Sequence, residues 1–454
     1  MTQFLWESLF VSGRALRRSI RAVFISMAVL ATFLLRTALN DREQLLKVYS
    51  FITFLLSFLS LPVLFMTGRG RSRLAERFGV WNLDYQGEII WFHGASVGEV
   101  NGLLPLIKEA RKTFPEKKIL LSATSTTGLE RGAAQVDFFK LLPFDCDVWL
   151  KNALKNLKIS HFIFGETEVW PALLDRMTAN GIPAFLVNGR VSKRSFPRYR
   201  LMSSLTAAAL QKVRLIQAAD EDSKQLFIAL GAALERTTVS GNAKYDFTPI
   251  SLSQVEKHSL IEEFFLESRP LITLGSLRPG EEEFWFPALK KAYSRGLKIN
   301  VVVAPRHKEK YSFFEERLRH LTLDYKTRSS AGKSNIIFLD TMGELEKFYC
   351  ISKLAFIGGT LKDYGGHNPI EAAAHGAAIV MGPFVSNIHE IVESLKSENA
   401  LFQIKDEKDV FELLMNITSN NDLIEQKGNA AKKVWTNYRG ATARIWQSII
   451  RARQ

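Results

Sequence analysis

A short segment, WFHGASVGEVNG at residues 91–102, combines an apolar start with small residues and one carboxylate, Glu99. Ser96 and Glu99 have the spacing of a capping box, in which both side chains close the N-terminus of a helix. A helix capped there would carry a glycine and Pro105 in its interior, so we expect it to begin nearer Leu103 and to leave the turn free. A phosphate cradle is unfavourable because Glu99 would repel the anion. Helix capping and a proton acceptor at a strand end therefore both stay open for this segment.

A second segment, GGHNPIEAAAHG at residues 365–376, carries strong signals for a helix start. Asn368 has the position of an N-cap, Pro369 that of the first helical residue, and Glu371 follows three residues after the cap. A structural helix with good caps would look the same. Because the segment follows a predicted strand and two glycines, it also predicts a nucleotide site, with phosphate at the helix end and ribose hydroxyls on Glu371.

Three further loops follow predicted strands in the same half: GSLRPGEEE (275–283), APRHKEK (304–310) and DTMGELEKF (340–348). Arg306 offers a planar fork for a phosphate or carboxylate, although an arginine at such a place is as often a surface ion pair. The patterns GxxxxGK[ST] and GxGxxG are both missing from the sequence, which argues against P-loop and dinucleotide chemistry.

In the first half, GETEVWP (165–171) places Glu166 and Glu168 after a strand and before a helix that starts at a proline. The alternative is that these acids only stabilise the first turn of that helix. The next segment, NGRVSKRSFPRYR (188–200), has five basic residues and no acid. It is either a solvated basic loop or a contact for anionic lipid phosphates, and less favourably for RNA.

Metal and disulfide chemistry find little support in the sequence. The triplet Asp145-Cys146-Asp147 matches the short DxD motif with which many sugar transferases hold a metal, but it precedes a predicted helix, where such acids are common. The two cysteines, Cys146 and Cys350, form no CxxC pair, and the eight histidines form no HExxH motif. We therefore predict no metal site.

Apolar, β-rich runs alternate with helix-length connections from residue 88 onward, which predicts parallel sheets covered on both faces. The runs span residues 88–93, 118–124, 161–166, 182–188 and 214–219, and then 269–276, 297–305, 334–340, 353–359 and 377–382. Two doubly wound, Rossmann-like α/β domains, joined near residues 244–255, account for this rhythm. Ligands of such domains bind at the carboxyl ends of the strands, and two facing domains make a cleft.

The 454-residue chain has a net charge of +14, which indicates an anionic partner. Residues 48–66 are uncharged and would form a helix of about 28 Å, whereas the apolar run at 22–35 would reach only about 21 Å, at roughly 1.5 Å per residue. Arginines flank both runs, so either topology leaves the rest of the chain in the cytoplasm. We predict an uncleaved membrane anchor of one or two helices within residues 1–68; a buried soluble helix is the alternative.

Nine short motifs, in order along the chain, resemble the 3-deoxy-D-manno-octulosonate (Kdo) transferases of lipopolysaccharide synthesis, which are GT-B glycosyltransferases. They are ERFG (76–79), SVGEV (96–100), SATSTTG (122–128), LPFD (142–145), ETEVWP (166–171), SGNAKYD (240–246), APRH (304–307), DTMGEL (340–345) and GGHNPIE (365–371). The resemblance implies an acceptor-binding domain at 69–246 and a donor-binding domain at 247–454, whose last helix packs back on the first domain. It also implies inverting transfer of Kdo from CMP-Kdo to a lipid A precursor at the cytoplasmic face of the inner membrane.

The resemblance also implies roles for individual residues. Glu99 would deprotonate the acceptor hydroxyl, while Glu166 and Lys244 would stabilise the transition state. No metal or other cofactor and no nucleic acid partner is expected. The residues implied for CMP binding are Pro305, Arg306, Met342, Gly343, Glu344, Asn368, Pro369, Ile370 and Glu371.

Two departures from the family pattern concern the acceptor contacts and the donor loop: NGRVSKRS stands where NARLSxRS is more common, and GSLRPGEEE keeps only the frame of GSTxxGEE. Two other functions compete with Kdo transfer. One is a membrane-associated GT-B transferase that uses a different nucleotide sugar. The other is a non-catalytic, membrane-tethered binder of anionic lipid or RNA.

Overall fold

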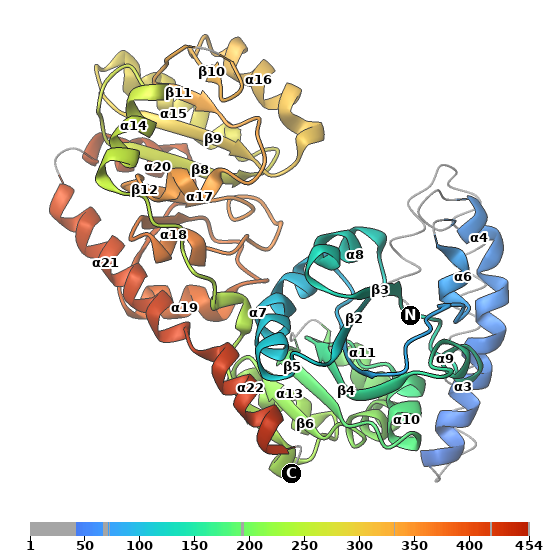
Figure 1. Cartoon of the computed structure of the whole chain (residues 1–454). Coiled ribbons are helices and arrows are strands. Elements are labelled where there is room, and N and C mark those ends of the chain that lie inside the picture. Colours follow the sequence, from blue (N-terminus) through green and yellow to red (C-terminus); the bar gives the residue numbers. More distant parts are fainter. Residues whose placement is uncertain are drawn as a thin grey trace. The chain divides into compact units, whose positions relative to one another are not determined.

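The computed structural model describes residues 42–66, 71, 73–191, 195–330, 332–417 and 420–452. Contacts divide the chain into two compact units, one formed by Met1–Phe247 with Gly440–Gln454 and the other by Thr248–Arg439 (Figure 1). Each unit contains a parallel sheet with helices on both faces, so the prediction of two Rossmann-like α/β domains is confirmed.

The first unit is built on a seven-stranded sheet in the order β3-β2-β1-β4-β5-β6-β7, and every neighbouring pair is parallel. Its strands are β1 (Glu88–His93), β2 (Lys118–Ala123), β3 (Phe138–Leu141), β4 (Lys158–Gly165), β5 (Ala184–Gly189), β6 (Leu215–Ala218) and β7 (Thr237–Val239). Its helices are α3 (Arg42–Leu59), α4 (Leu61–Met66), α6 (Leu74–Arg77), α7 (Val97–Thr113), α8 (Thr126–Gly132), α9 (Asp147–Ala153), α10 (Pro171–Ala179), α11 (Phe196–Leu201), α12 (Ser203–Leu210), α13 (Glu221–Ala229) and α22 (Ala441–Ala452), with short 3-10 turns η1 (Ala133–Gln135), η2 (Leu234–Arg236) and η3 (Ala243–Tyr245).

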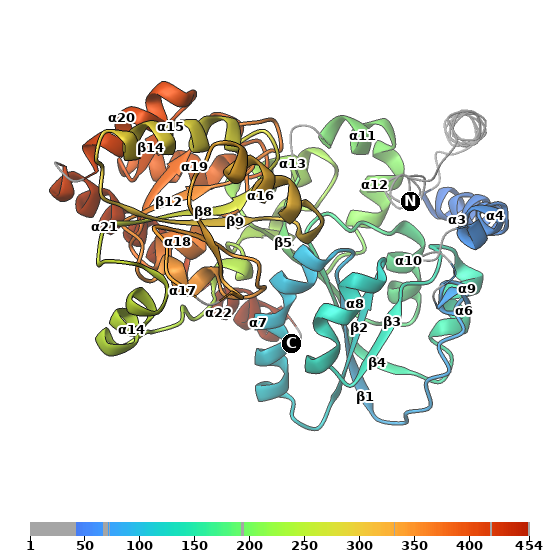
Figure 2. The ribbon, with the colours of Figure 1, turned by 90° about the horizontal axis from the view of Figure 1, so that it is seen from above.

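Successive side chains of each strand point to opposite faces of the sheet, so this unit has two hydrophobic cores. Ile89 and Trp91 of β1 face a core that α9, α10, α12 and α13 cover. Ile90 and Phe92 face the opposite core, where α7 and the C-terminal helix α22 pack. Helices cover both faces of this sheet (Figure 2). Its central strands are therefore buried on both faces, which explains why the sequence shows continuous apolar runs.

The second unit has its own seven-stranded parallel sheet, in the order β10-β11-β9-β8-β12-β13-β14. Its strands are β8 (Leu271–Leu277), β9 (Asn300–Pro305), β10 (Lys326–Thr327), β11 (Ile336–Phe338), β12 (Leu354–Ile357), β13 (Ala378–Met381) and β14 (Leu401–Gln403). The accompanying helices are α14 (Gln254–Phe264), α15 (Glu282–Ser294), η4 (Lys308–Lys310), α16 (Tyr311–His320), α17 (Leu345–Tyr349), α18 (Ile370–Ala374), α19 (His389–Ser397), α20 (Glu407–Asn416) and α21 (Asn421–Tyr438).

The predicted membrane run at 48–66 falls on α3 and α4, which are separated at Ser60. One side of α3 is attached to the first unit by polar contacts: Tyr49 Oη donates to Asp145 Oδ2 at 2.9 Å, and Thr53 Oγ1 donates to the carbonyl oxygen of Asp145 at 2.7 Å. Among the residues that the structure describes, no helix combines the length and the apolar character needed to cross a bilayer. The second apolar run, at 22–35, lies outside the described residues.

Candidate active site

Glu99 lies in the first turn of α7, which begins at Val97 with Ser96 as its N-cap. The prediction that this helix begins near Leu103 is therefore wrong, and Pro105 lies inside it. An interior proline costs about 3 kcal/mol. Burial of an apolar side chain of this size contributes about 1.5–3 kcal/mol, and α7 buries Leu103 and several others against the sheet. The free energy gained by burying these side chains therefore exceeds the cost of the proline inside the helix.

The carboxylate of Glu99 is fixed by two local donors. The backbone N–H of Ala95 donates to Oε2 at 2.7 Å, and Ser96 Oγ donates to Oε1 at 3.1 Å. Burial, reinforced by the charges of Glu168 and Glu166, raises the pKa of Glu99 to about 9. Capping and a proton-accepting role, which the sequence left as alternatives, are compatible in this geometry because the carboxylate that closes the turn also has a high proton affinity.

Glu166 and Lys244 lie in the same unit and interact electrostatically with each other. Glu166 directly follows β4 with a left-handed backbone (φ 55°), and its N–H donates to the carbonyl oxygen of Val187 at 3.0 Å. Burial raises the pKa of Glu166, while the positive charges of Lys244 and Arg190 oppose that shift. The structure thus groups Glu99, Glu166 and Lys244, together with Arg190 from the basic segment, at one end of the first sheet.

One side-chain amide joins the elements that carry these groups. Asn188, near the end of β5, donates from Nδ2 to the carbonyl oxygen of Gly102 in α7 at 3.1 Å. Its Oδ1 accepts from the N–H of Ala243, the residue before Lys244, at 2.8 Å. A side chain at Gly102 would come within 3.2 Å of this amide, so glycine permits the close approach. Asn188 thereby couples the position of the Glu99 helix to that of the Lys244 turn.

The sequence interpretation did not single out two other members of this cluster, His93 and Tyr199. His93 is the last residue of β1 and fully buried, and its Nε2 lies 3.8 Å from Oε2 of Glu168. Tyr199 of α11 donates to the carbonyl oxygen of Thr167 at 3.0 Å, and burial with the charge of Glu168 raises its pKa to about 12. The sequence did offer one indication for His93: it ends an apolar strand directly before the loop that carries Glu99, where ligands of such sheets bind.

In the second unit, strand order decides which loops meet. The strands β11, β9, β8 and β12 are consecutive neighbours and parallel, so the loops at their carboxyl ends share one edge. The predicted donor-binding residues follow three of these strands: Pro305 and Arg306 at β9, Met342 to Glu344 after β11, and Asn368 to Glu371 after β12.

The predicted helix start at Asn368 is displaced by one residue. Helix α18 begins at Ile370, Pro369 occupies the N-cap position, and Oδ1 of Asn368 accepts from the N–H of Ile370 at 3.1 Å. Glu371 is exposed in the first turn. The asparagine therefore closes the start of this five-residue helix, as its residue type predicts, from one position further out.

The other predicted donor residues differ in their surroundings. Arg306 is exposed, and its guanidinium makes no hydrogen bond or ion pair with another residue in the described part of the chain. Met342 is 72% exposed. The carboxylate of Glu344 accepts hydrogen bonds from Thr341 and from Nη2 of Arg328, the latter at 3.1 Å. Burial alone would raise the pKa of Glu344, but these two contacts outweigh it and the pKa is lowered.

Glu281 organises this edge of the sheet, although the sequence interpretation gave it no role. Its buried carboxylate accepts backbone N–H groups from the loop after β12 at 2.9 Å and from Arg278 in its own loop at 2.8 Å. The three donors after β12 are Gly359, Thr360 and Leu361. Burial raises the pKa of Glu281 in spite of these donors. The first glutamate of GSLRPGEEE was the signal available in the sequence.

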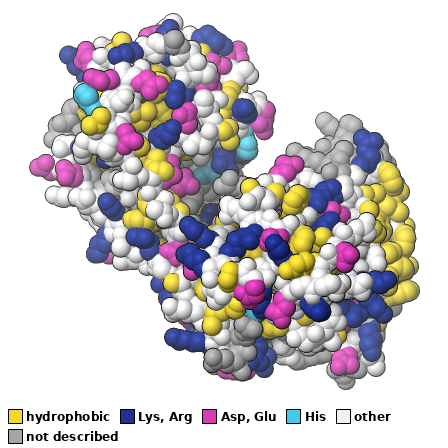
Figure 3. Space-filling model, viewed as in Figure 1, with side chains coloured by type: hydrophobic (Ala, Val, Ile, Leu, Met, Phe, Trp, Pro, Cys, Tyr) yellow, Lys and Arg dark blue, Asp and Glu magenta, His cyan; other side chains and the backbone are white. Residues whose placement is uncertain are grey.

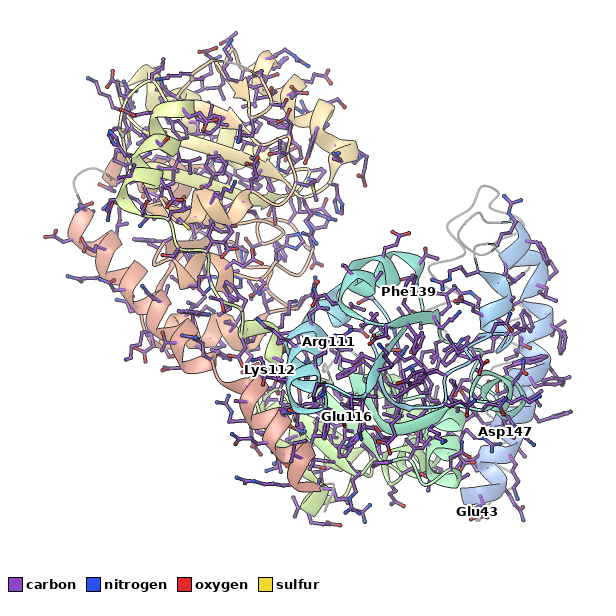
Figure 4. The ribbon with its side chains drawn as sticks, viewed as in Figure 1. Glu43, Arg111, Lys112, Glu116, Phe139 and Asp147 are labelled. Carbon is purple, nitrogen blue, oxygen red and sulfur yellow. The ribbon has the colours of Figure 1, made fainter. Side chains whose placement is uncertain are left out.

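Both acids of the DxD-like triplet have structural partners. Asp145 is buried and accepts the N–H groups of Ala172 and Leu173, at 3.2 and 2.8 Å, so it caps α10. Asp147, at the start of α9, lies on the surface beside α3 (Figure 4). Its carboxylate pairs with Arg176. In the described part of the chain, no group of three His, Cys, Asp or Glu side chains is arranged to hold a metal.

Comparison with known proteins gives consistent results. The family model described as 3-deoxy-D-manno-octulosonic-acid transferase (kdotransferase) matches residues 72–247. A 3-deoxy-D-manno-octulosonic acid transferase from Haemophilus influenzae is 29% identical over 389 residues, which cover 83% of this chain and 90% of that protein. A bifunctional glycosyltransferase/methyltransferase from Fusobacterium nucleatum is 29% identical over 350 residues, 75% of this chain; the chain spans 54% of the length of that relative.

Among solved structures, a glycosyltransferase from Rickettsia africae has a TM-score of 0.56 and 14% identity, and the match covers 81% of this chain and 98% of that one. This likeness supports the two-domain GT-B-like fold. The sequence matches extend over most of both units. Residues 72–247 therefore match the 3-deoxy-D-manno-octulosonic-acid (Kdo) transferase family, and the chain is similar to curated transferases of that name over most of its length.

Proposed function

We propose that this glycosyltransferase transfers Kdo from CMP-Kdo to a lipid A precursor with inversion at the anomeric carbon. The observation that carries the proposal is the grouping of Glu99, a carboxyl with a pKa raised to about 9, with Glu166 and Lys244 in one unit. A carboxylate of that basicity is well matched to a sugar hydroxyl that loses its proton in the transition state.

In the proposed reaction, the acceptor hydroxyl gives its proton to Glu99 while its oxygen forms a bond to the anomeric carbon of Kdo. The bond from that carbon to the phosphate oxygen breaks, and its electron pair leaves with CMP. Glu166 stabilises the positive charge that develops on the sugar ring, and Lys244 stabilises the negative charge of the donor carboxylate or phosphate.

The second unit is proposed to bind the donor. The guanidinium of Arg306 is exposed and has no hydrogen-bond or ion-pair partner among the described residues, so it is suited to bidentate contact with a phosphate. Glu371 is exposed on the same sheet edge and would accept the ribose hydroxyls. The remaining donor contacts are assigned to Pro305, Met342, Gly343, Glu344, Asn368, Pro369 and Ile370. We propose that the reaction needs no metal, because CMP leaves as a monophosphate whose charge protein cations can balance.

Purified protein incubated with CMP-Kdo and a bisphosphorylated lipid A precursor, in detergent with EDTA, tests the proposal. CMP release and a mass increase of one Kdo residue per transfer are expected, and Glu99→Ala should abolish both while CMP still binds. Turnover of a different nucleotide sugar alone would support the competing GT-B transferase. Binding of anionic lipid without any turnover would support the non-catalytic alternative.

We further propose that the chain is attached to the inner membrane, with both units on the cytoplasmic side. The support is an apolar outer side of α3 and α4, along which Figure 3 shows a continuous group of hydrophobic side chains. Phe51 is 62% exposed and Leu59 is 55% exposed; the other members are Leu55, Phe58 and Phe65. Flotation with vesicles of inner-membrane lipid composition tests the attachment, and replacing Phe51 and Leu59 by aspartate should weaken it. Unchanged flotation of the substituted protein would contradict the role of α3 and α4 in membrane attachment.

A further inference from the structure

Arg278 and Arg306 follow neighbouring backbone positions at the carboxyl edge of the second sheet. Strands β8 and β9 are parallel neighbours, and their register pairs Leu277 with Pro305. Each arginine directly follows one member of this pair, and the backbone N–H of Arg306 donates to the carbonyl oxygen of Leu277 at 3.0 Å. Because paired strands lie about 4.8 Å apart, the two cations extend from adjacent points of the same edge.

The guanidinium of Arg278 is held by uncharged groups. Its Cζ lies 4.3 Å from the ring centroid of Tyr364, whose hydroxyl donates to the carbonyl oxygen of Pro279 at 3.1 Å. Nη1 of Arg278 donates to Nε2 of His307. The backbone N–H of Arg278 donates to the buried carboxylate of Glu281 at 2.8 Å. Both the main chain and the side chain of this arginine therefore have fixed positions.

His307 accepts the hydrogen bond from Arg278 as a neutral ring. A guanidinium only donates, so Nε2 carries the lone pair and the proton is on Nδ1, which faces Oε1 of Glu309 at 3.8 Å. Burial and the positive charge of Arg278 both lower the pKa of His307, in agreement with this protonation state. The histidine thus orients the guanidinium without cancelling its charge.

No acid neutralises the guanidinium of Arg278 within the part of the chain that the structure describes. Its Nε is buried and makes no hydrogen bond, and Nη2 has no partner among the described residues. Lys362, in the loop after β12, differs because its Nζ pairs with Glu283 at 3.1 Å. A buried donor without an acceptor is unfavourable, so an oxyanion that accepts from this fork would relieve the cost.

We propose that Arg278 is a further donor-binding residue, whose guanidinium binds an oxyanion of the nucleotide sugar beside Arg306. A planar fork fixed by an aromatic ring and a histidine matches the oxygens of a phosphate or a carboxylate, and CMP-Kdo carries one of each. In the frame GSTxxGEE this arginine occupies the first variable position, so the family pattern does not require it. The inference rests on the proposed donor role of the second unit.

Calorimetric titration of the purified full chain with cytidine, CMP and CMP-Kdo tests the proposal, because these ligands carry no oxyanion, a phosphate, and a phosphate with a carboxylate. The variant is Arg278→Gln, and Arg295→Gln is the matched control. Arg295 lies 5.0 Å from the ring centroid of Phe411 and likewise has no acidic partner among the described residues. It follows α15, which returns the chain to the opposite edge of the sheet.

If Arg278 binds the phosphate, Arg278→Gln should weaken CMP and CMP-Kdo roughly 10- to 100-fold and leave cytidine within about twofold of wild type. If it binds the sugar carboxylate, only CMP-Kdo should lose affinity by that factor. Arg295→Gln should bind all three ligands as wild type does. An equal loss for cytidine, or unchanged affinity for all three ligands, would overturn the proposal.

Tyr364→Leu is a second variant, which keeps the positive charge and removes the ring that fixes it. The same ligands should bind about three- to tenfold more weakly, again without an effect on cytidine; a matching loss for cytidine would count against the proposal. The titrations need no turnover. A selective loss of CMP or CMP-Kdo affinity in a protein that transfers no Kdo would sink the proposed function and leave the role of Arg278 standing. Kdo transfer with unchanged affinities in Arg278→Gln would do the reverse.

Discussion

The side-chain oxygen of Asn188 accepts a 2.8 Å hydrogen bond from the backbone N–H of Ala243. The same side chain donates to the carbonyl oxygen of Gly102 in α7. Two segments that lie far apart in the sequence, one carrying Glu99 and the other Lys244, therefore meet at one amide. This relationship makes the spacing between the proposed base and the proposed cation depend on a residue outside the reaction itself.

Replacing Asn188 by alanine should lower the rate of transfer at least about tenfold, because positioning within a fraction of an ångström is needed for proton transfer. CMP affinity should stay within about twofold, since the donor residues lie in the other unit. Asn188 has a left-handed backbone (φ 52°), so alanine also adds strain. Asn156→Ala is the matched control, because Asn156 has a left-handed backbone (φ 66°) on the surface away from the site. Equal rate losses in both variants would show that backbone strain, and not the amide contacts, is responsible.

Glu99→Gln should stabilise the protein at alkaline pH. The pKa of Glu99 is about 9 in the folded protein, well above that of an unfolded glutamate. The folded state therefore holds the proton more tightly, and its stability falls as pH rises from about 4.5 to 9. Glutamine removes this loss, so the gain should be near zero at pH 5 and about 1–3 kcal/mol at pH 9. Urea unfolding at both pH values measures it; a gain that is independent of pH would contradict a raised pKa.

Glu281→Ala should destabilise the second unit by at least about 3 kcal/mol, because four backbone N–H groups, three of them buried, lose their acceptor. The loops after β8 and β12 should become less ordered, and CMP affinity should fall with them. Urea unfolding and calorimetric titration with CMP measure the two effects. Glu283→Ala is the control, since this neighbouring acid makes only a surface ion pair with Lys362, worth at most about 1 kcal/mol. Similar losses from the two variants would contradict the organising role of Glu281.

Tyr49→Phe should weaken the attachment of α3 to the first unit. The substitution removes a 2.9 Å hydrogen bond to the buried carboxylate of Asp145, and bonds to charged groups contribute about 1.5–3 kcal/mol. Faster cleavage of the N-terminal region by a protease, together with a lower free energy of unfolding, is the expected result. Tyr85→Phe serves as the control, because the Tyr85 hydroxyl makes no hydrogen bond with another described residue. Unchanged cleavage in Tyr49→Phe would mean that apolar contacts alone hold α3.

The sequence was sufficient to predict the strands that build the two cores. The run at 88–93 coincides with β1, and the other nine apolar runs each overlap a strand of the sheets. Such strands are buried on both faces, so continuous apolar runs mark them directly. The four strands without such a run are β3, β7, β10 and β14, which lie at the edges of the sheets, where fewer apolar side chains are required.

The local pattern was a poorer guide at the site. Gly102 and Pro105 argued against a helix at Ser96, but burial of the inner side of α7 and the Asn188 contact to Gly102 decide its start. The uncharged run at 48–66 predicted a membrane helix, yet Tyr49 and Thr53 within it donate hydrogen bonds to Asp145, almost a hundred residues away.

The sequence by itself determined the two α/β domains, the family motifs and the residue types available for acid–base and phosphate chemistry. Only the tertiary structure decided that Glu168 lies beside His93, that Glu281 ties two loops together and that Asn188 couples two distant segments. The physical reason is that periodicity reports which side chains are buried, whereas hydrogen bonds and charge interactions depend on distances between residues that the chain brings together only on folding.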